Sequence, residues 1–123
     1  MINLQNKAAE AVAYAIHRVI GDRAIYTGPL ASDLVKDDLI VQSKAPSRTR
    51  TSYGNRKSSL NLVTSTTVAN IEGVTHVLTR KLELVVSAPV GTTDAEYLED
   101  KARLASLSDA DYLAIVKTGK IEI

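Results

Sequence analysis

The sequence predicts an α+β fold, in which a multi-stranded antiparallel sheet with an N-terminal hairpin is followed by two C-terminal helices. Three observations lead to this prediction. Segments of alternating apolar and polar residues, separated by Gly-containing turns, recur over residues 2–88. Two helix start signals follow after residue 92. The chain has 123 residues, a length typical of one domain, so we expect a single domain over 1–123.

Composition limits both the core and the chemistry. The apolar fraction is 45% without any Phe or Trp, so the core is expected to be aliphatic. Cys is absent, which excludes disulfides, thiolate zinc sites and cysteine nucleophiles. No apolar run approaches the ~20 residues that span a bilayer, and the N-terminus does not resemble a signal peptide. The net charge is +1, so affinity for a polyanion would need local clustering of charge.

Residues 1–28 are expected to form the N-terminal strands. Ile2 to Gln5 predicts a short strand, and Val12–Ile20 with Arg23–Thr27 predicts a hairpin around the Gly21-Asp22 turn. The composition of residues 11–20 is also compatible with a helix. In the strand interpretation one face carries Val12, Tyr14, Ile16 and Arg18. Residues 30–38 are expected to form a polar connection that contains acidic residues.

The segment 44–65 predicts a hairpin whose turn is at Gly54-Asn55. This turn places Ser52 opposite Lys57, Arg50 opposite Ser59, Arg48 opposite Asn61, and Lys44 opposite Ser65. One face then carries Lys44, Arg48, Arg50, Ser52, Lys57, Ser59, Asn61 and Ser65. The other carries Ala45, Thr49, Thr51, Ser58, Leu60, Leu62 and Thr64.

The first of these faces is basic and almost without apolar residues. No Asp or Glu occurs from Leu39 to Ile71. Cations interspersed with Ser and Asn on a flat surface favour a polyanion partner, above all a nucleic acid. The alternative is a solvated face whose cations prevent aggregation at a sheet edge. Tyr53 in the turn is either a base-stacking residue or an ordinary turn aromatic.

A third long strand is expected from Val74 to Ser87, completing a three-stranded meander over residues 39–88. A three-residue loop, 71–73, with Gly73 in a left-handed conformation, places the even-numbered leucines of both strands on one face. The resulting pairs are Leu62 with Leu82, Leu60 with Leu84, Lys81 with Val63, Thr79 with Ser65, and Glu83 with Asn61. The same parity puts Arg80 on the core side.

Two helices are predicted over residues 94–117. Thr93 and Glu96 form a capping box for a helix from Asp94 to about Leu107. Its apolar stripe is Ala95, Leu98, Ala102 and Ala105. Ser108 caps a second helix from Asp109 to about Lys117, with Leu113 and Val116 inward and Gly119 as the C-terminal cap. The tail 120–123 alternates in a way that could extend a sheet edge.

Two short helices are a thin cover for a wide sheet, so we expect a dimer. Either helices of one chain cover the sheet of the other, or the two sheets join at their edges. His17 and His76 lie on different predicted strands, and neither has the neighbours of a metal site. No catalytic motif is present. We therefore expect neither an enzyme nor a metal site or cofactor.

Two segments resemble the coat proteins of single-stranded RNA bacteriophages, the leviviruses. They are SRTRTSYGNRKSSLNLV, above all Asn55-Arg56-Lys57, and RKLELVVSAPVGTTDAEYLEDKARLASL. The first 40 residues match only in general layout. The resemblance implies an intertwined dimer with sheets joined edge to edge and helices interlocked, assembled into an icosahedral shell. It also implies that the open sheet face binds genomic RNA and an RNA hairpin, which represses replicase translation.

The resemblance implies RNA contacts for Ser52, Lys57, Ser59, Asn61, Thr79, Lys81 and Glu83. The predicted register adds Arg48 and Arg50, one of which a bulge could turn away. Lys44 and Arg56 complete the candidate RNA-binding set. The implied location is the virion, assembled in the cytoplasm of a bacterial host, with no membrane and no small-molecule substrate as partners. The alternative is a dimeric cellular RNA- or DNA-binding regulator that forms no shell.

Overall fold

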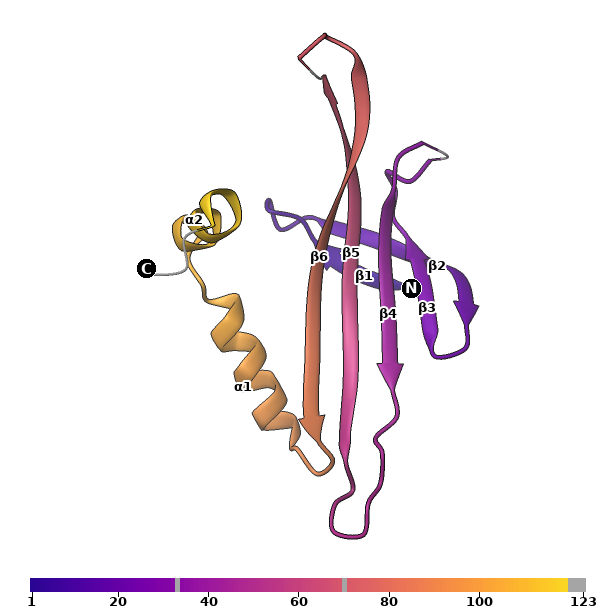
Figure 1. The fold of residues 1–123 in the computed structure, drawn as a ribbon, viewed down its shortest axis with the longest axis vertical. Helices are drawn as coiled ribbons and strands as arrows, with labels where there is room; N and C mark the ends of the chain where they lie inside the picture. The colour runs from indigo at the N-terminus through magenta and orange to yellow at the C-terminus, as the bar shows by residue number, and fades with distance from the viewer. Residues whose placement is uncertain (33, 70, 120–123) are drawn as a thin grey trace. The chain divides into compact units, whose positions relative to one another are not determined.

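The structure is a computed structural model that describes residues 1–32, 34–69 and 71–119, and its chain divides into two units, 1–90 and 91–123. The first unit is a six-stranded antiparallel sheet, and the second contains two helices (Figure 1). The predicted α+β fold is confirmed. The expectation for the tail 120–123 falls outside the described residues.

The strands lie in the sheet in the order in which they occur in the chain. They are β1 (Ile2–Gln5), β2 (Ala11–Ile20), β3 (Arg23–Thr27), β4 (Asp37–Lys44), β5 (Asn55–Ala69) and β6 (Thr75–Pro89). Every neighbouring pair is antiparallel, so the sheet is one continuous meander. Figure 1 shows β4, β5 and β6 side by side, with β2 running across their direction.

A bulge at His17 divides β2. Ile16 lies opposite Tyr26, but Arg18 lies opposite Ile25, because one extra residue is inserted between the two pairs. The predicted strand is confirmed, and the helix alternative is wrong. The uniform alternation predicted for this strand is also wrong beyond Ile16, since Arg18 is turned to the face opposite that of Ile16.

The predicted register of the central hairpin is wrong. Lys44 lies opposite Lys57 instead of Ser65, and residues 45–54 form a loop. Pro46 has no N–H group to donate, so the strand ladder does not continue through it. The observed register instead pairs Leu39 with Leu62.

This loop has hydrogen bonds of its own. The Thr49 N–H donates to the Ser52 carbonyl oxygen at 2.8 Å, and the Gly54 N–H donates to Ser52 Oγ at 3.0 Å. Gly54 has φ +82°, and a Cβ there would meet the Ser47 backbone. Gly54, which the sequence predicts to lie in a tight hairpin turn, is therefore the last residue of a longer loop.

The predicted register between β5 and β6 is confirmed. Leu62 lies opposite Leu82, Leu60 opposite Leu84, Asn61 opposite Glu83, Val63 opposite Lys81, and Ser65 opposite Thr79. Gly73 is left-handed, with φ +81°, as the turn prediction requires. Arg80 lies on the predicted side and donates to Thr64 Oγ1 at 3.2 Å.

The sheet has two unlike faces. The polar face includes Ala15, Arg18, Ile20, Arg23, Ile25, Thr27, Asp38, Ile40, Gln42, Lys44, Lys57, Ser59, Asn61, Val63, Ser65, Thr79, Lys81, Glu83, Val85 and Ser87. The apolar face includes Tyr26, Leu39, Val41, Leu60, Leu62, Leu82, Leu84 and Val86, and it also carries the polar residues Asp37, Ser43, Arg56, Ser58, Thr64 and Arg80. In the described part of the chain, the buried apolar side chains are limited to Tyr14, Leu39 and Ala88.

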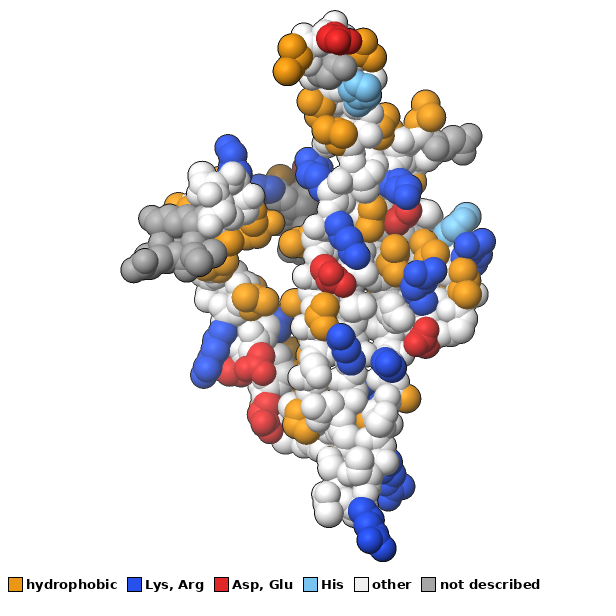
Figure 2. Space-filling view, in the orientation of Figure 1, with side chains coloured by type: hydrophobic (Ala, Val, Ile, Leu, Met, Phe, Trp, Pro, Cys, Tyr) orange, Lys and Arg blue, Asp and Glu red, His pale blue; other side chains and the backbone are white. Residues whose placement is uncertain are grey.

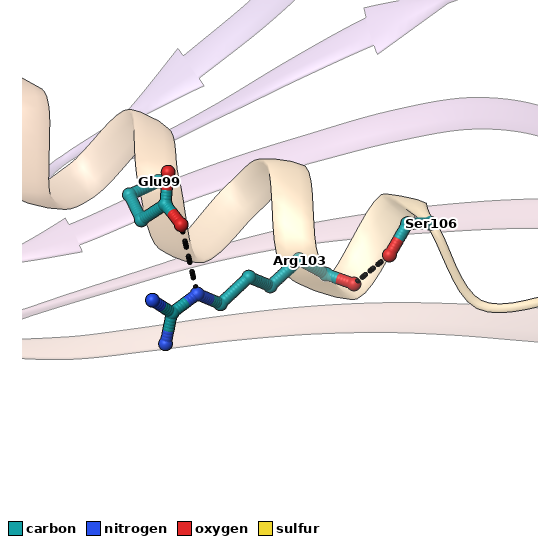
Figure 3. Close-up of polar contacts among 3 residues, drawn as sticks. All are labelled: Glu99, Arg103 and Ser106. Carbon is teal, nitrogen blue, oxygen red and sulfur yellow. Dashed lines mark hydrogen bonds and ion pairs between the residues drawn. The ribbon is translucent and has the colours of Figure 1, made fainter.

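Helix α1 (Asp94–Ala105) begins with the predicted capping box between Thr93 and Glu96. Arg103 Nε donates to Glu99 Oε1 at 2.9 Å, and Ser106 Oγ donates to the Arg103 carbonyl oxygen at 2.7 Å (Figure 3). The helix ends two residues before the predicted Leu107, where these contacts close its last turn.

Helix α2 (Asp109–Thr118) begins at Ser108 and ends at the left-handed Gly119, as predicted. No described residue of α1 or α2 is buried. The predicted inward positions are wrong for the single chain, because Leu113 and Val116 are 49% and 56% exposed. An apolar stripe indicates a face suited to burial.

Candidate nucleic-acid interface

Two lysines face each other near one end of the polar face. Lys44 on β4 lies directly opposite Lys57 on β5, with Ser87 of β6 next in the same row. Both lysines are exposed. Like charges in directly opposed positions destabilise a sheet, because their Cβ atoms are only about 5 Å apart. An anion placed between the two ammonium groups would remove this repulsion.

The next part of the polar face carries short hydrogen-bonding groups. Ser59 lies between Gln42 and Val85, and Thr79 Oγ1 is 3.4 Å from Ser65 Oγ. These side chains are too short to rise far above the strands. A flat surface with hydroxyl groups can approach riboses and base edges closely.

Asn61 and its neighbours carry both an unsatisfied acceptor and a weak ion pair. Asn61 Oδ1 is shielded from solvent without a hydrogen-bond partner among the described residues. An unsatisfied acceptor of this kind is unfavourable, so a ligand donor at Asn61 would stabilise the site. Lys81 Nζ lies 4.0 Å from Glu83 Oε2, and both side chains are about half exposed. Such an exposed pair is weak and leaves Lys81 able to bind another anion.

Arg48, Arg50 and Ser52 are not on the sheet, but in the loop 45–54. Arg48 Cζ lies 5.0 Å from the centroid of the Tyr53 ring, within the range of a cation–π contact. Tyr53 is 64% exposed, so its ring remains accessible for stacking. Figure 2 shows Lys and Arg side chains over the sheet and at the tip of this loop.

Arg56 lies on the opposite side of β5 from Lys57, because successive strand residues alternate between faces. Its Nη1 donates to Ser43 Oγ at 3.3 Å, and Ser43 Oγ is 3.3 Å from Ser58 Oγ. The structure thus brings together Lys44, Lys57, Ser59, Asn61, Thr79, Lys81 and Glu83 on the polar face. It separates them from Arg56 and from the three loop residues.

The charged and amide-bearing polar-face residues that the sequence prediction missed include Arg18, Arg23, Asp38 and Gln42. Arg23 lies opposite Gln42, and Thr27 lies opposite Asp38. The parity of β3 relative to β4 would have found Arg23, Asp38 and Gln42, but the connection 28–36 has no tight-turn signal from which to count. Arg18 reaches this face only through the bulge in β2. Asp38 also means that the polar face is less free of acidic groups than the sequence interval 39–71 indicated.

A buried polar contact anchors β2 to the start of β4. Tyr14 Oη donates to Asp37 Oδ1 at 2.8 Å, and the Leu30 N–H donates to Asp37 Oδ2 at 3.3 Å. Burial, followed by the hydrogen bond to Asp37, raises the pKa of Tyr14 to about 12. Gly28 leaves the room for this contact, since a Cβ there would lie 2.4 Å from Asp37 Oδ2.

Residues 1–32, 34–69 and 71–119 contain no group of His, Cys, Asp and Glu that could hold a metal ion. Within the same residues, no helix has the length and apolar character needed to cross a membrane.

The fold is similar to the folds of chains from three virus-like particles. The particle protein of Beihai levi-like virus 32 superposes with a TM-score of 0.80 at 20% identity, covering 90% of this chain and 88% of that chain. The particle protein of Wenzhou levi-like virus 4 superposes with a TM-score of 0.75 at 19% identity, covering 89% of this chain and 78% of that chain. The particle protein of bacteriophage AVE019 superposes with a TM-score of 0.74 at 14% identity, covering 99% of this chain and 96% of that chain.

These likenesses confirm the predicted resemblance to levivirus-type coat proteins at the level of the fold. The likeness to the AVE019 particle protein extends over 99% of this chain and so includes most of the first 40 residues, where the sequence resemblance is only general. No protein-family model matches the sequence, and no curated protein matches it either.

Proposed function

We propose that this chain is the coat protein of a single-stranded RNA bacteriophage. Its copies form dimers, the dimers assemble into an icosahedral shell, and the shell packages the genome against the polar face. The protein then resides in the virion after assembly in the cytoplasm of its bacterial host. The shared fold with particle proteins of levi-like viruses supports this function.

The observation that carries the proposal is the uncovered apolar face of the sheet. Leu60, Leu82 and Leu84 are 37%, 55% and 38% exposed in the single chain. An exposed apolar surface that spans two long strands is typical of a protein–protein interface. Most apolar side chains of α1 and α2, such as Leu98, Leu113 and Val116, are exposed as well, so a second copy can supply the cover that each chain needs.

The free edge of the sheet supports edge-to-edge pairing in the dimer. β6 is the last strand of the sheet, and one of its sides has no strand partner in the described part of the chain. It is 15 residues long, which leaves many backbone groups available for pairing. Long open edges tend to pair with another chain. Two β6 strands paired in this way would make one continuous polar face from two chains.

The polar face binds RNA mainly through electrostatics. Arg18, Arg23, Lys44, Lys57 and Lys81 supply cations, and each phosphate that they neutralise releases counterions. With six to ten such contacts, the affinity for RNA falls by a factor of ~10³–10⁵ as the salt concentration rises over a moderate range. Dimerisation doubles the number of contacts, and a shell multiplies it further. An RNA hairpin that contains a ribosome-binding site would be bound by the same face, which would repress its translation.

Expression of the chain alone in bacteria tests this function. Gel filtration, electron microscopy and the ultraviolet absorbance ratio report particle size and nucleic-acid content. Closed shells of uniform size that contain host RNA are the expected result. A salt-sensitive dimer without shells would instead identify a cellular RNA- or DNA-binding regulator. A monomer without nucleic acid would contradict both functions.

A further inference from the structure

A shallow hollow lies where the bulged part of β2 meets β3 and the start of β4. Its walls include His17, Arg18, Ile25, Thr27, Lys36 and Asp38. Arg18, Ile25, Thr27 and Asp38 all belong to the polar face. The hollow is therefore on the side of the sheet that carries the proposed RNA contacts, but none of its lining residues belongs to the candidate RNA-binding set.

The bulge at His17 creates the cationic side of this hollow. Without the extra residue, Arg18 would share a face with Ile16 and point away from Ile25. Because of the bulge, Arg18 lies directly opposite Ile25. Both Arg18 and Lys36 are exposed. Two cations at the rim of a hollow can bind the phosphates on either side of one nucleotide.

Among the described residues that line the hollow, Asp38 is the one that carries a carboxylate. It is half-buried and lies between Thr27 on β3 and Val63 on β5. Within the described residues, its carboxylate has neither a hydrogen bond nor an ion pair. A carboxylate repels phosphate, so its presence among cations favours a ligand that brings hydrogen-bond donors as well as negative charge.

We propose that this hollow binds a guanine nucleotide of single-stranded RNA, an inference that rests on the proposed RNA-packaging function. Guanine presents two adjacent donors on its Watson–Crick edge, N1–H and the N2 amino group, which match the two oxygens of Asp38. Adenine and cytosine each present one amino donor beside an acceptor, and uracil presents one N–H between two acceptors. The Ile25 side chain provides an apolar surface beneath the base, and Arg18 and Lys36 neutralise its phosphates.

A charge-matched pair of variants tests the role of Asp38. Binding of the purified full-length chain, freed of host RNA, is measured by fluorescence anisotropy with a short adenine oligonucleotide and with the same oligonucleotide carrying one guanine. The wild-type chain is expected to prefer the guanine-containing strand by about tenfold, as one good bidentate contact provides. Asp38→Asn is expected to reduce this preference to less than about twofold.

Asp22→Asn is the control variant, because it makes the same substitution at an exposed turn of the same sheet, outside both the hollow and the candidate RNA-binding set. Each substitution removes one negative charge and so changes binding to both oligonucleotides, which makes the ratio of the two affinities the informative quantity. Asp22→Asn is expected to retain the wild-type ratio. An equal loss of the ratio in both variants would show a general electrostatic effect and overturn the proposal.

A change in the ligand tests the same contact without altering the protein. Inosine lacks only the N2 amino group of guanine, so replacing guanine with inosine is expected to weaken wild-type binding several-fold and to leave Asp38→Asn unaffected. If the wild-type chain binds guanine, inosine and adenine strands equally, the guanine site is refuted while RNA binding stands. If it binds none of them, the proposed function itself fails.

Discussion

Asp37 is only 5% exposed, whereas most other acidic residues in the described part of the chain are exposed. Tyr14 Oη and the Leu30 N–H donate to its carboxylate, the first from β2 and the second from the connection before β4. A buried carboxylate is tolerated only when such donors compensate for the lost water. This residue therefore holds the N-terminal strands in position against β4.

Replacing Tyr14 with Phe removes one of these donors and is expected to lower the free energy of unfolding by about 1–3 kcal/mol, because Asp37 is left under-satisfied. Chemical denaturation monitored by circular dichroism measures the change. Tyr53→Phe is the control, since Tyr53 is 64% exposed and its hydroxyl is not part of the buried contact. Equal stability of the two variants would contradict the anchoring role of Tyr14.

The raised pKa of Tyr14 also predicts the pH dependence of stability. The folded state favours the neutral phenol, whose pKa rises from 10.0 to about 12. The associated stabilisation is therefore fully present below pH 10 and is lost as the pH rises from 10 towards 12. Unfolding curves across this window should show a steeper decline for the wild type than for Tyr14→Phe. Parallel declines would exclude Tyr14 as the titrating group.

At the scale of single elements, β5 places two adjacent cations on opposite faces. Lys57 belongs to the polar face, whereas Arg56 contacts Ser43 on the other side. Lys57→Gln is expected to weaken RNA binding and to reduce the slope of log affinity against log salt by about 1. Arg56→Gln removes the same charge from the neighbouring position and should leave the slope unchanged. Equal slopes for both variants would show that the faces do not differ in RNA contact.

Helix α1 depends on its capping box because the isolated helix buries none of its described residues. Thr93 Oγ1 accepts from the Glu96 N–H at 3.3 Å, and Glu96 Oε1 accepts from the Thr93 N–H at 3.3 Å. Thr93→Ala is expected to reduce stability by about 1 kcal/mol and to lower helicity in far-ultraviolet circular dichroism. Thr93→Ser keeps the hydroxyl and should behave as wild type. A wild-type spectrum and stability for the alanine variant would show that the cap is dispensable.

For the whole molecule, the decisive property is the difference between the two faces of the sheet. Leu82 on the apolar face and Val85 on the polar face both belong to β6 and are 55% and 46% exposed. Leu82→Lys is expected to prevent dimer and particle formation, because it places a charge in the surface that a second copy would cover. Val85→Lys should still assemble, since it adds a cation to the polar face. Sedimentation analysis measures both, and particles formed by Leu82→Lys would refute the proposed interface.

The predictability of the fold varied with the kind of signal available. The β5–β6 register was predictable because Gly73 and the parity of the leucines constrain it independently. The β4–β5 register was not, because parity assigns a residue to a face without determining how far one strand slides along the other. The error was an even number of residues, so Lys44 remained on the same face as Lys57, Ser59 and Asn61.

The sequence by itself determined the order of the strands and helices, both helix starts and the left-handed Gly119, because these depend on neighbouring residues. Only the tertiary structure decided that Arg18 joins the polar face, that Arg56 leaves it and that Asp37 is buried. These placements depend on a bulge, a loop and contacts between residues that are far apart in the chain. Such features follow from packing across the sheet, where the local pattern of residues carries little information.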